Sequence, residues 1–129
     1  MPPNAPKPPS GSPAIRTVMM PRDTNADETI FGGVILSLID QAAYVEARRQ
    51  ARHRYVTVYF KEVAFREPVY VGDVLSLFAD TERIGRTSIT INVQVRADRR
   101  REPTSDVHVT QAQVVFVAVD EHGKPVDVL

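Results

Sequence analysis

One proline-free run of residues, from Phe31 to about Ala51, stands alone in a chain whose other ordered-looking segments alternate between apolar and polar residues. Leucine, isoleucine, alanine and arginine dominate this run after Gly33, so we predict a single long helix, with Thr29 as a candidate cap. At helical spacing one stripe is polar: Ser37, Asp40, Gln41, Tyr44 and Arg48. The opposite stripe is apolar: Ile35, Leu38, Ile39 and Ala42. Such a helix is expected to be largely enclosed by protein.

Segments with a period of two flank this helix, and that period is typical of β-strands. They are residues 15–20 before the helix and 55–65, 73–83, 86–98 and 107–119 after it, with turns at Gly72 and Gly85. Residues 86–98 alternate most cleanly, as in an antiparallel sheet with one face on the core. The last segment is apolar on both faces from Val114 to Val119, so we expect one face to meet the helix and the other a partner subunit. The order predicts an α+β fold, a helix lying along a curved antiparallel sheet.

Composition limits the remaining classes of protein. The chain has 129 residues, enough for one domain, and residues 1–13 hold six prolines among small polar residues. We therefore predict a disordered tail over 1–13 and a single domain over 14–129. Sixteen basic residues balance sixteen acidic ones, which favours neither nucleic acid nor an anionic membrane as a partner. The chain contains no cysteine and no apolar run long enough to cross a bilayer, so we expect a cytoplasmic protein.

Familiar catalytic motifs are absent from the sequence, which contains no zinc-ligand spacing, phosphate loop or serine elbow. The three histidines are scattered, and we expect neither a metal nor a cofactor. What remains is a helix that opens with Gly32 and Gly33 and carries Asp40 two turns later. Free N–H groups at a helix start suit an anion or a polarised carbonyl oxygen. From the residues alone, Asp40 is either a general base or nucleophile or a solvated surface carboxylate.

The stretch from Pro21 to Ala43, PRDTNADETIFGGVILSLIDQAA, resembles the signature of hotdog-fold acyl-CoA thioesterases. In that family a D-x-N loop precedes a glycine pair and then an acidic residue on the helix. Further blocks match in the same order, so that the resemblance covers roughly residues 16–121: Val56-Thr57-Val58, Pro68 with Val71-Gly72-Asp73-Val74, Gly85-Arg86-Thr87-Ser88 and Phe116-Val117-Ala118-Val119-Asp120. The resemblance implies the short bacterial type of cytosolic acyl-CoA hydrolase, in which a long central helix is wrapped by the sheet.

The resemblance also implies a site shared between two protomers. Asp40 would activate water or act as the nucleophile, Asn25 of the other protomer would orient water or substrate, and the Gly33 N–H would stabilise the oxyanion. The expected substrate-binding residues lie within the blocks that match the family: Phe31, Gly32, Val58, Gly85, Arg86, Thr87 and Ser88. Arg86 would lie near a coenzyme A phosphate, although an exposed hairpin charge is its alternative role. Coenzyme A would be part of the substrate and not a cofactor. Relatives suggest a dimer at least, and we expect a trimer of dimers.

Two departures from the family pattern concern the substrate. Glu28 stands where glycine is common, and Ala64 stands where asparagine or aspartate is common. Neither replaces Asn25 or Asp40. Two other functions stay open at this point: a non-catalytic acyl-CoA binding or sensing module on the same fold, and a hotdog hydratase. The hydratase is less favoured because those enzymes present an aspartate and histidine pair, and no histidine stands near residues 25–40.

Overall fold

The computed structural model describes residues 11–100 and 106–129, so that most of the predicted proline-rich tail lies outside the described residues. The described chain contains one α-helix, one 3-10 helix and five strands. In chain order these are β1 (Ile15–Val18), η1 (Pro21–Asp23), α1 (Gly32–Gln50), β2 (Arg54–Lys61), β3 (Val74–Ile84), β4 (Ser88–Asp98) and β5 (Asp106–Val119). The predicted order of one strand, one long helix and four strands is confirmed.

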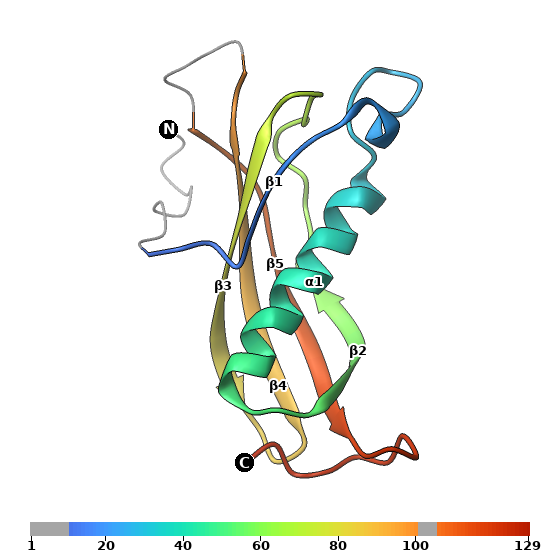
Figure 1. Cartoon of the computed structure of the whole chain (residues 1–129), viewed down its shortest axis with the longest axis vertical. Helices are drawn as coiled ribbons and strands as arrows, with labels where there is room; N and C mark the ends of the chain where they lie inside the picture. Colours follow the sequence, from blue (N-terminus) through green and yellow to red (C-terminus); the bar gives the residue numbers. More distant parts are fainter. Residues whose placement is uncertain (1–10, 101–105) are drawn as a thin grey trace.

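All strands pair antiparallel in one sheet of order β1-β3-β4-β5-β2. The sheet curves around α1, which lies diagonally across its concave face (Figure 1). The predicted turn at Gly72 is present, with Gly72 at φ +89°, a value that favours glycine. Strand β2 is joined to the sheet through β5 alone and is therefore an edge strand. No helix among the described residues is long and apolar enough to cross a membrane.

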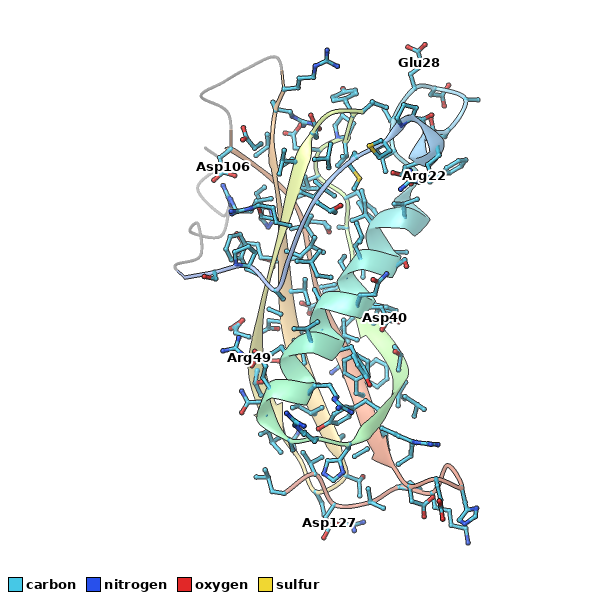
Figure 2. The ribbon with its side chains drawn as sticks, viewed as in Figure 1. Arg22, Glu28, Asp40, Arg49, Asp106 and Asp127 are labelled. Atoms are coloured by element: carbon cyan, nitrogen blue, oxygen red, sulfur yellow. The ribbon has the colours of Figure 1, made fainter. Side chains whose placement is uncertain are left out.

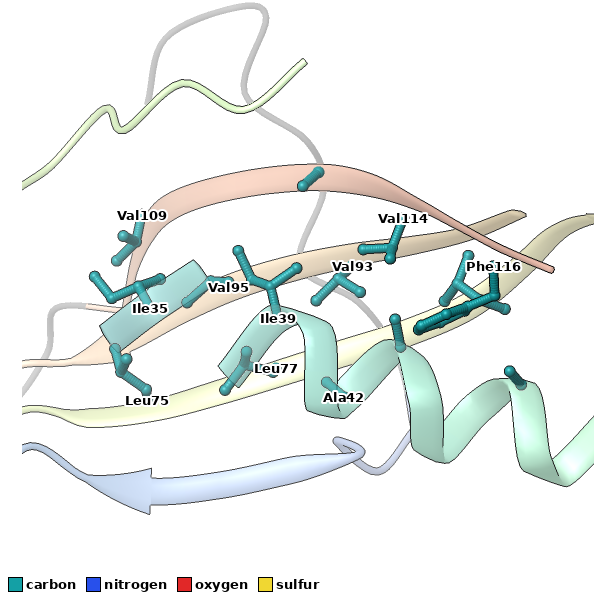
Figure 3. Close-up of a cluster of buried hydrophobic side chains, with 14 of the residues drawn as sticks. Ile35, Ile39, Ala42, Leu75, Leu77, Val93, Val95, Val109, Val114 and Phe116 are labelled. Carbon is teal, nitrogen blue, oxygen red and sulfur yellow. The ribbon is translucent and has the colours of Figure 1, made fainter. Parts of the chain in front are cut away.

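The core lies between α1 and the concave face of β3, β4 and β5 (Figure 3). Ile39, in the middle of α1, is fully buried and meets the apolar side chains that alternate along β4. Fully burying a side chain of this size stabilises a fold by about 1.5–3 kcal/mol. The predicted apolar stripe is shifted slightly, because Leu38 is only half-buried while Ala43 and Ala47 are fully buried. Small residues on this side let the helix approach the sheet closely.

The outer face of β4 is mostly half-exposed, as its alternation predicts, with one exception. Arg96 is buried and donates from Nε to Asp106 at 3.1 Å. His108, opposite Arg96 on β5, is also buried, and neither ring nitrogen has a hydrogen-bond partner within the described structure. Burial, followed by the nearby charges of Arg96 and Arg66, lowers the pKa of His108 below its usual value. The neutral imidazole is therefore the favoured form in the fold.

The ends of two strands and the cap of the helix differ from prediction. Strand β1 ends at Val18 and not at residue 20. Strand β2 ends at Lys61 and not at residue 65, because Glu62 takes a left-handed conformation, φ 56°, that interrupts an extended strand. Thr29 does not cap α1: the N-cap is Phe31, which makes no side-chain capping bond. The Thr29 hydroxyl instead accepts a hydrogen bond from Asn25.

Part of the second apolar face of β5 is already covered within the single chain, whereas Val117 on that face is half-exposed, so the expected partner contact there stays a prediction. Val115 and Val119 are only 7% and 8% exposed within the single chain. The C-terminal segment covers the end of this strand, with Val126 N–H donating to Ala118 O at 2.8 Å. Exposed apolar side chains lie on β2: Val56, Val58, Tyr59 and Phe60. A β-bulge interrupts the pairing of β2 with β5 between Thr57 and Tyr59.

Candidate active site

Asp40 lies in the middle of α1 on the side that faces β2 (Figure 2). Its Oδ1 accepts a hydrogen bond of 2.7 Å from the Thr57 hydroxyl. Thr57 pairs with the buried Phe116, and directly opposed residues of an antiparallel pair point to the same face. Thr57 therefore points toward the helix and orients the Asp40 carboxylate. Sequence reasoning did not single out Thr57, and only the helix-to-strand pairing identifies it.

The carboxylate is half-buried, and the strand that holds it is apolar and exposed. Val58, the next residue on β2, is 52% exposed, and Phe31 at the start of α1 is 53% exposed. The Phe65 ring lies beside the helix start, where a side-chain carbon added at Gly32 would meet it at 3.5 Å, an ordinary contact distance. The predicted Phe31 and Val58 are therefore both exposed apolar side chains, one at the start of α1 and one on β2. An acyl or pantetheine chain is chemically suited to such a surface.

The first turn of α1 offers backbone donors. The N–H groups of Gly32 and Gly33 have no acceptor within the described residues, whereas Val34 N–H donates to Phe31 O at 3.1 Å. The space where a Gly33 side chain would lie is open, with no atom within 4 Å. A polarised oxygen can therefore approach the Gly33 N–H closely.

Asn25 lies in the loop between η1 and α1, and its side chain is bound inside that loop. Its Oδ1 accepts from Asp27 N–H at 2.8 Å and from Thr29 N–H at 3.2 Å, and its Nδ2 donates to Thr29 Oγ1 at 2.9 Å. Asn25 makes no hydrogen bond with Asp40 among the described contacts. Asp40 is eight residues beyond the first residue of α1, which at 1.5 Å per residue is about 12 Å along the helix. Within one chain, the two predicted catalytic residues therefore lie apart.

The turn Gly85-Arg86-Thr87-Ser88 joins β3 to β4 at the other end of the molecule. Gly85 N–H donates to Ser88 O at 2.8 Å, which closes the turn. Arg86 pairs with Asp127 at 3.2 Å, both side chains being exposed. Asp127 and Glu28, which belongs to the loop of Asn25, lie at opposite ends of the structure (Figure 2). The predicted site residues thus form separate groups in one chain: the loop, the helix start with Asp40, and this turn.

A hollow of about 640 Å³ opens beside the loop, between η1 and the turn before β3, and sequence reasoning did not predict it. Its lining is charged and includes Glu28, Asp73 and Arg99. Arg99 and Asp73 form a close ion pair there, and Arg99 also lies over the Tyr70 ring. Asp40 does not line this hollow. The proposed catalytic carboxylate therefore belongs to a different part of the surface.

Comparison with known proteins places this geometry in a family. A family model described as the thioesterase superfamily matches residues 27–104. The acyl-CoA thioester hydrolase YciA of Escherichia coli is 40% identical over 119 residues, which are 91% of this chain and 90% of YciA. Cj0915, a hexameric hotdog fold thioesterase of Campylobacter jejuni, superposes with a TM-score of 0.86 at 40% identity, covering 92% of this chain and 91% of that chain.

A third match is an acyl-CoA hydrolase of Staphylococcus aureus, solved with butyryl coenzyme A and coenzyme A. It superposes with a TM-score of 0.80 at 32% identity, covering 88% of this chain and 69% of that chain. Its alanine variants at one asparagine and one aspartate, 15 residues apart in that protein, have also been solved. Asn25 and Asp40 have the same separation here. The chain belongs to the thioesterase superfamily, as a hotdog-fold member of its acyl-CoA thioester hydrolases.

Proposed function

We propose that this protein hydrolyses acyl-CoA thioesters to a free acid and coenzyme A, with Asp40 as general base and Asn25 supplied by a second protomer. The observation that carries the proposal is the hydrogen bond from Thr57 to Asp40. It holds a carboxylate at fixed orientation between α1 and an exposed apolar strand. YciA and the structural neighbours are named for this reaction.

In the proposed reaction, Asp40 takes a proton from water as the water oxygen attacks the thioester carbonyl carbon. The carbonyl oxygen gains negative charge, which the Gly33 N–H stabilises. When the tetrahedral intermediate collapses, the carbon–sulfur bond breaks and the departing thiolate takes the proton from Asp40. General base catalysis contributes about 10²- to 10⁴-fold and an oxyanion donor about 10²- to 10³-fold. No cofactor is needed, since the substrate carries coenzyme A itself.

The assembly follows from the edge strand. An exposed edge strand with apolar side chains is a ready surface for pairing with a second chain, and β2 has both properties. We therefore propose a two-fold dimer that pairs β2 with its symmetry mate and brings Asn25 of one protomer toward Asp40 of the other. Since Cj0915 is hexameric, we propose a trimer of dimers for this chain. We place the enzyme in the cytoplasm, with which a cysteine-free chain is compatible.

Mixing two inactive variants tests the shared site. Asp40→Ala and Asn25→Ala are each expected to be inactive in an assay that follows free thiol from acetyl-, butyryl- and palmitoyl-CoA. After the two proteins are unfolded together and refolded, half of the dimers are mixed, and each mixed dimer regains one intact site. The mixture is then expected to recover about a quarter of wild-type activity. Recovery of no activity would contradict a shared site.

The same assay tests the reaction itself. Wild-type protein that binds these acyl-CoAs without releasing thiol would favour the non-catalytic binding module. Full activity in Asp40→Ala would overturn the role of Asp40 while leaving hydrolysis intact. The refolded mixture is compared with wild-type protein refolded in the same way, so that losses during refolding are separated from losses of catalysis, and with each variant refolded alone as the inactive reference.

A further inference from the structure

The loop that carries Asn25 is closed by its own backbone. Asn25 N–H donates to Thr29 O at 2.8 Å, and Glu28 N–H donates to Asn25 O at 3.2 Å. The loop is anchored to the body of the protein at its end, where the buried Ile30 donates its N–H to Val69 O at 2.8 Å. Glu28 has a φ of 66°, in the left-handed region, which allows the tight reversal before Thr29. Asn25 is thus held at the base of a tied loop.

The side-chain bonds of Asn25 decide which of its polar groups are free. An amide oxygen has two lone pairs, and the Asn25 Oδ1 already accepts from the N–H groups of Asp27 and Thr29. Because both partners are obligate donors, the oxygen and nitrogen of this amide cannot be exchanged without losing both bonds. Of the two N–H groups on Nδ2, one is given to Thr29 Oγ1. Among the residues that the structure describes, the second N–H group of Asn25 Nδ2 has no acceptor.

We propose that Asn25 meets the reacting atoms only as an N–H donor, and that Thr29 is the positioning residue that fixes this donor. The inference rests on the proposed function, because it assumes that Asn25 reaches a reacting group. Because Oδ1 is occupied, Asn25 cannot accept a hydrogen bond from an O–H group of the attacking water. Accepting the proton of that water is therefore left to Asp40. The remaining N–H donates to the thioester oxygen or to a lone pair of the water. Thr29 touches neither and acts through the amide.

The first test replaces Thr29. Thr29→Val keeps the shape of the side chain but removes the acceptor for Asn25 Nδ2, and we expect kcat to fall about 10-fold with KM changed less than about 2-fold. Thr29→Ser keeps the acceptor and is expected to restore kcat to within about 3-fold of wild type. Thr24→Val is the matched control, since it removes a hydroxyl from the same loop, one that donates to Pro21 O at 2.6 Å. It is expected to leave kcat unchanged.

The second test replaces Asn25 and does not depend on the first. Asn25→Asp keeps an oxygen for the two backbone donors but removes both side-chain N–H groups. We expect its melting temperature to stay near that of wild type while kcat falls as far as in Asn25→Ala. Asn25→Ala is expected to lower the melting temperature as well, because the N–H groups of Asp27 and Thr29 lose their acceptor.

Three results would overturn the inference: substantial activity in Asn25→Asp, equal losses in Thr29→Val and Thr24→Val, or no rescue by Thr29→Ser. If Thr29→Val does not fold, the Asn25→Asp result decides. The inference and the proposed function fail differently. Absence of wild-type turnover on acetyl-, butyryl- and palmitoyl-CoA removes the function, whereas normal wild-type turnover with any of those three results removes only the donor role.

Discussion

Strands β4 and β2 belong to the same sheet but stand at opposite extremes of burial. Along β4 every inward residue from Ile89 to Ala97 is buried, and both edges are paired, with β3 and β5. Along β2 only Tyr55 is buried, and one edge has no neighbour among the described strands. Within one chain, β4 is therefore buried and paired on both edges, whereas β2 is exposed and paired on one edge only. Asp40 and Thr57 lie on the side of the exposed strand β2.

This difference separates the residues that hold the fold together from those that we propose to perform the chemistry. Changes along β4 should reduce the stability of the single chain, and changes beside β2 should reduce activity or assembly. Residues at an interface can be exposed in one chain and still be essential in the oligomer. Four measurements test this difference between the two strands.

The largest effect is expected on the β2 side, at Asp40. Asp40→Asn keeps the size of the side chain and an oxygen for Thr57 but is a poor proton acceptor, so kcat should fall about 10³-fold. The melting temperature should change little. Gln41→Ala, on the same polar stripe of α1, is the control and should retain activity. If Asp40→Asn kept activity within 10-fold of wild type, the proposed catalytic role of Asp40 beside β2 would be contradicted.

The next effect is a difference in stability between the two strands. Ile91→Ala removes buried methyl groups from β4 and should lower the free energy of unfolding by about 2–5 kcal/mol. Val58→Ala, on the exposed side of β2, should cost less than about 1 kcal/mol when unfolding is followed at protein concentrations where the oligomer has dissociated. Urea denaturation monitored by circular dichroism measures both. Equal losses would show that β2 is already buried in the monomer.

A smaller effect is expected at Thr57. Thr57→Val removes the hydroxyl that orients Asp40, and we expect kcat to fall about 10-fold, since a typical hydrogen bond to a charged group contributes about 1.5–3 kcal/mol. Thr57→Ser keeps the donor and should recover most of the rate. Kinetics at saturating butyryl-CoA separates this loss from weaker binding. A variant as active as wild type would mean that Asp40 is oriented without Thr57.

The smallest effect concerns the one place where the outer face of β4 is buried. The pKa of His108 is lowered by burial and by Arg96 and Arg66, while Asp106 is engaged with Arg96. The unfolded chain therefore takes up this proton more readily than the folded chain. Stability should fall as the pH drops below about 6.5, the ordinary value, and should not change through this group above it. His108→Gln should reduce the loss in melting temperature between pH 7 and pH 5.5.

Much of the fold could be predicted because the period of the apolar residues and the positions of proline and glycine are local properties of the sequence. The alternation along β4 and the proline-free run of α1 are both confirmed within one or two residues. The end of β2 was missed because alternation continues past Lys61 in the sequence, while the chain turns at Glu62. Thr29 was misassigned as a helix cap for a related reason: its hydroxyl has two local uses, and only the loop conformation selects Asn25.

The site was predictable only in part. The family resemblance, which includes the spacing of Asn25 and Asp40, pointed to the loop and the helix, but no pattern in the sequence distinguishes Thr57 from the other threonines on strands. Its role comes from the register of β2 on β5 and from the rotation of α1, which depend on packing between distant segments. The contact between the C-terminal segment and the end of β5 could not be predicted for the same reason.

The bulge in β2 decides which face of the sheet the later residues of this strand occupy. Before it, Thr57 faces the helix; after it, Phe60 pairs with the buried Val114 and faces the same way. Val58, the extra residue between them, keeps both on one side. If Val58 paired regularly with Val115 and formed no bulge, every later residue of β2 would change faces although the sequence stayed the same. A relative that lacks this one residue is therefore expected to have a regular strand here, with the same side chains facing the helix.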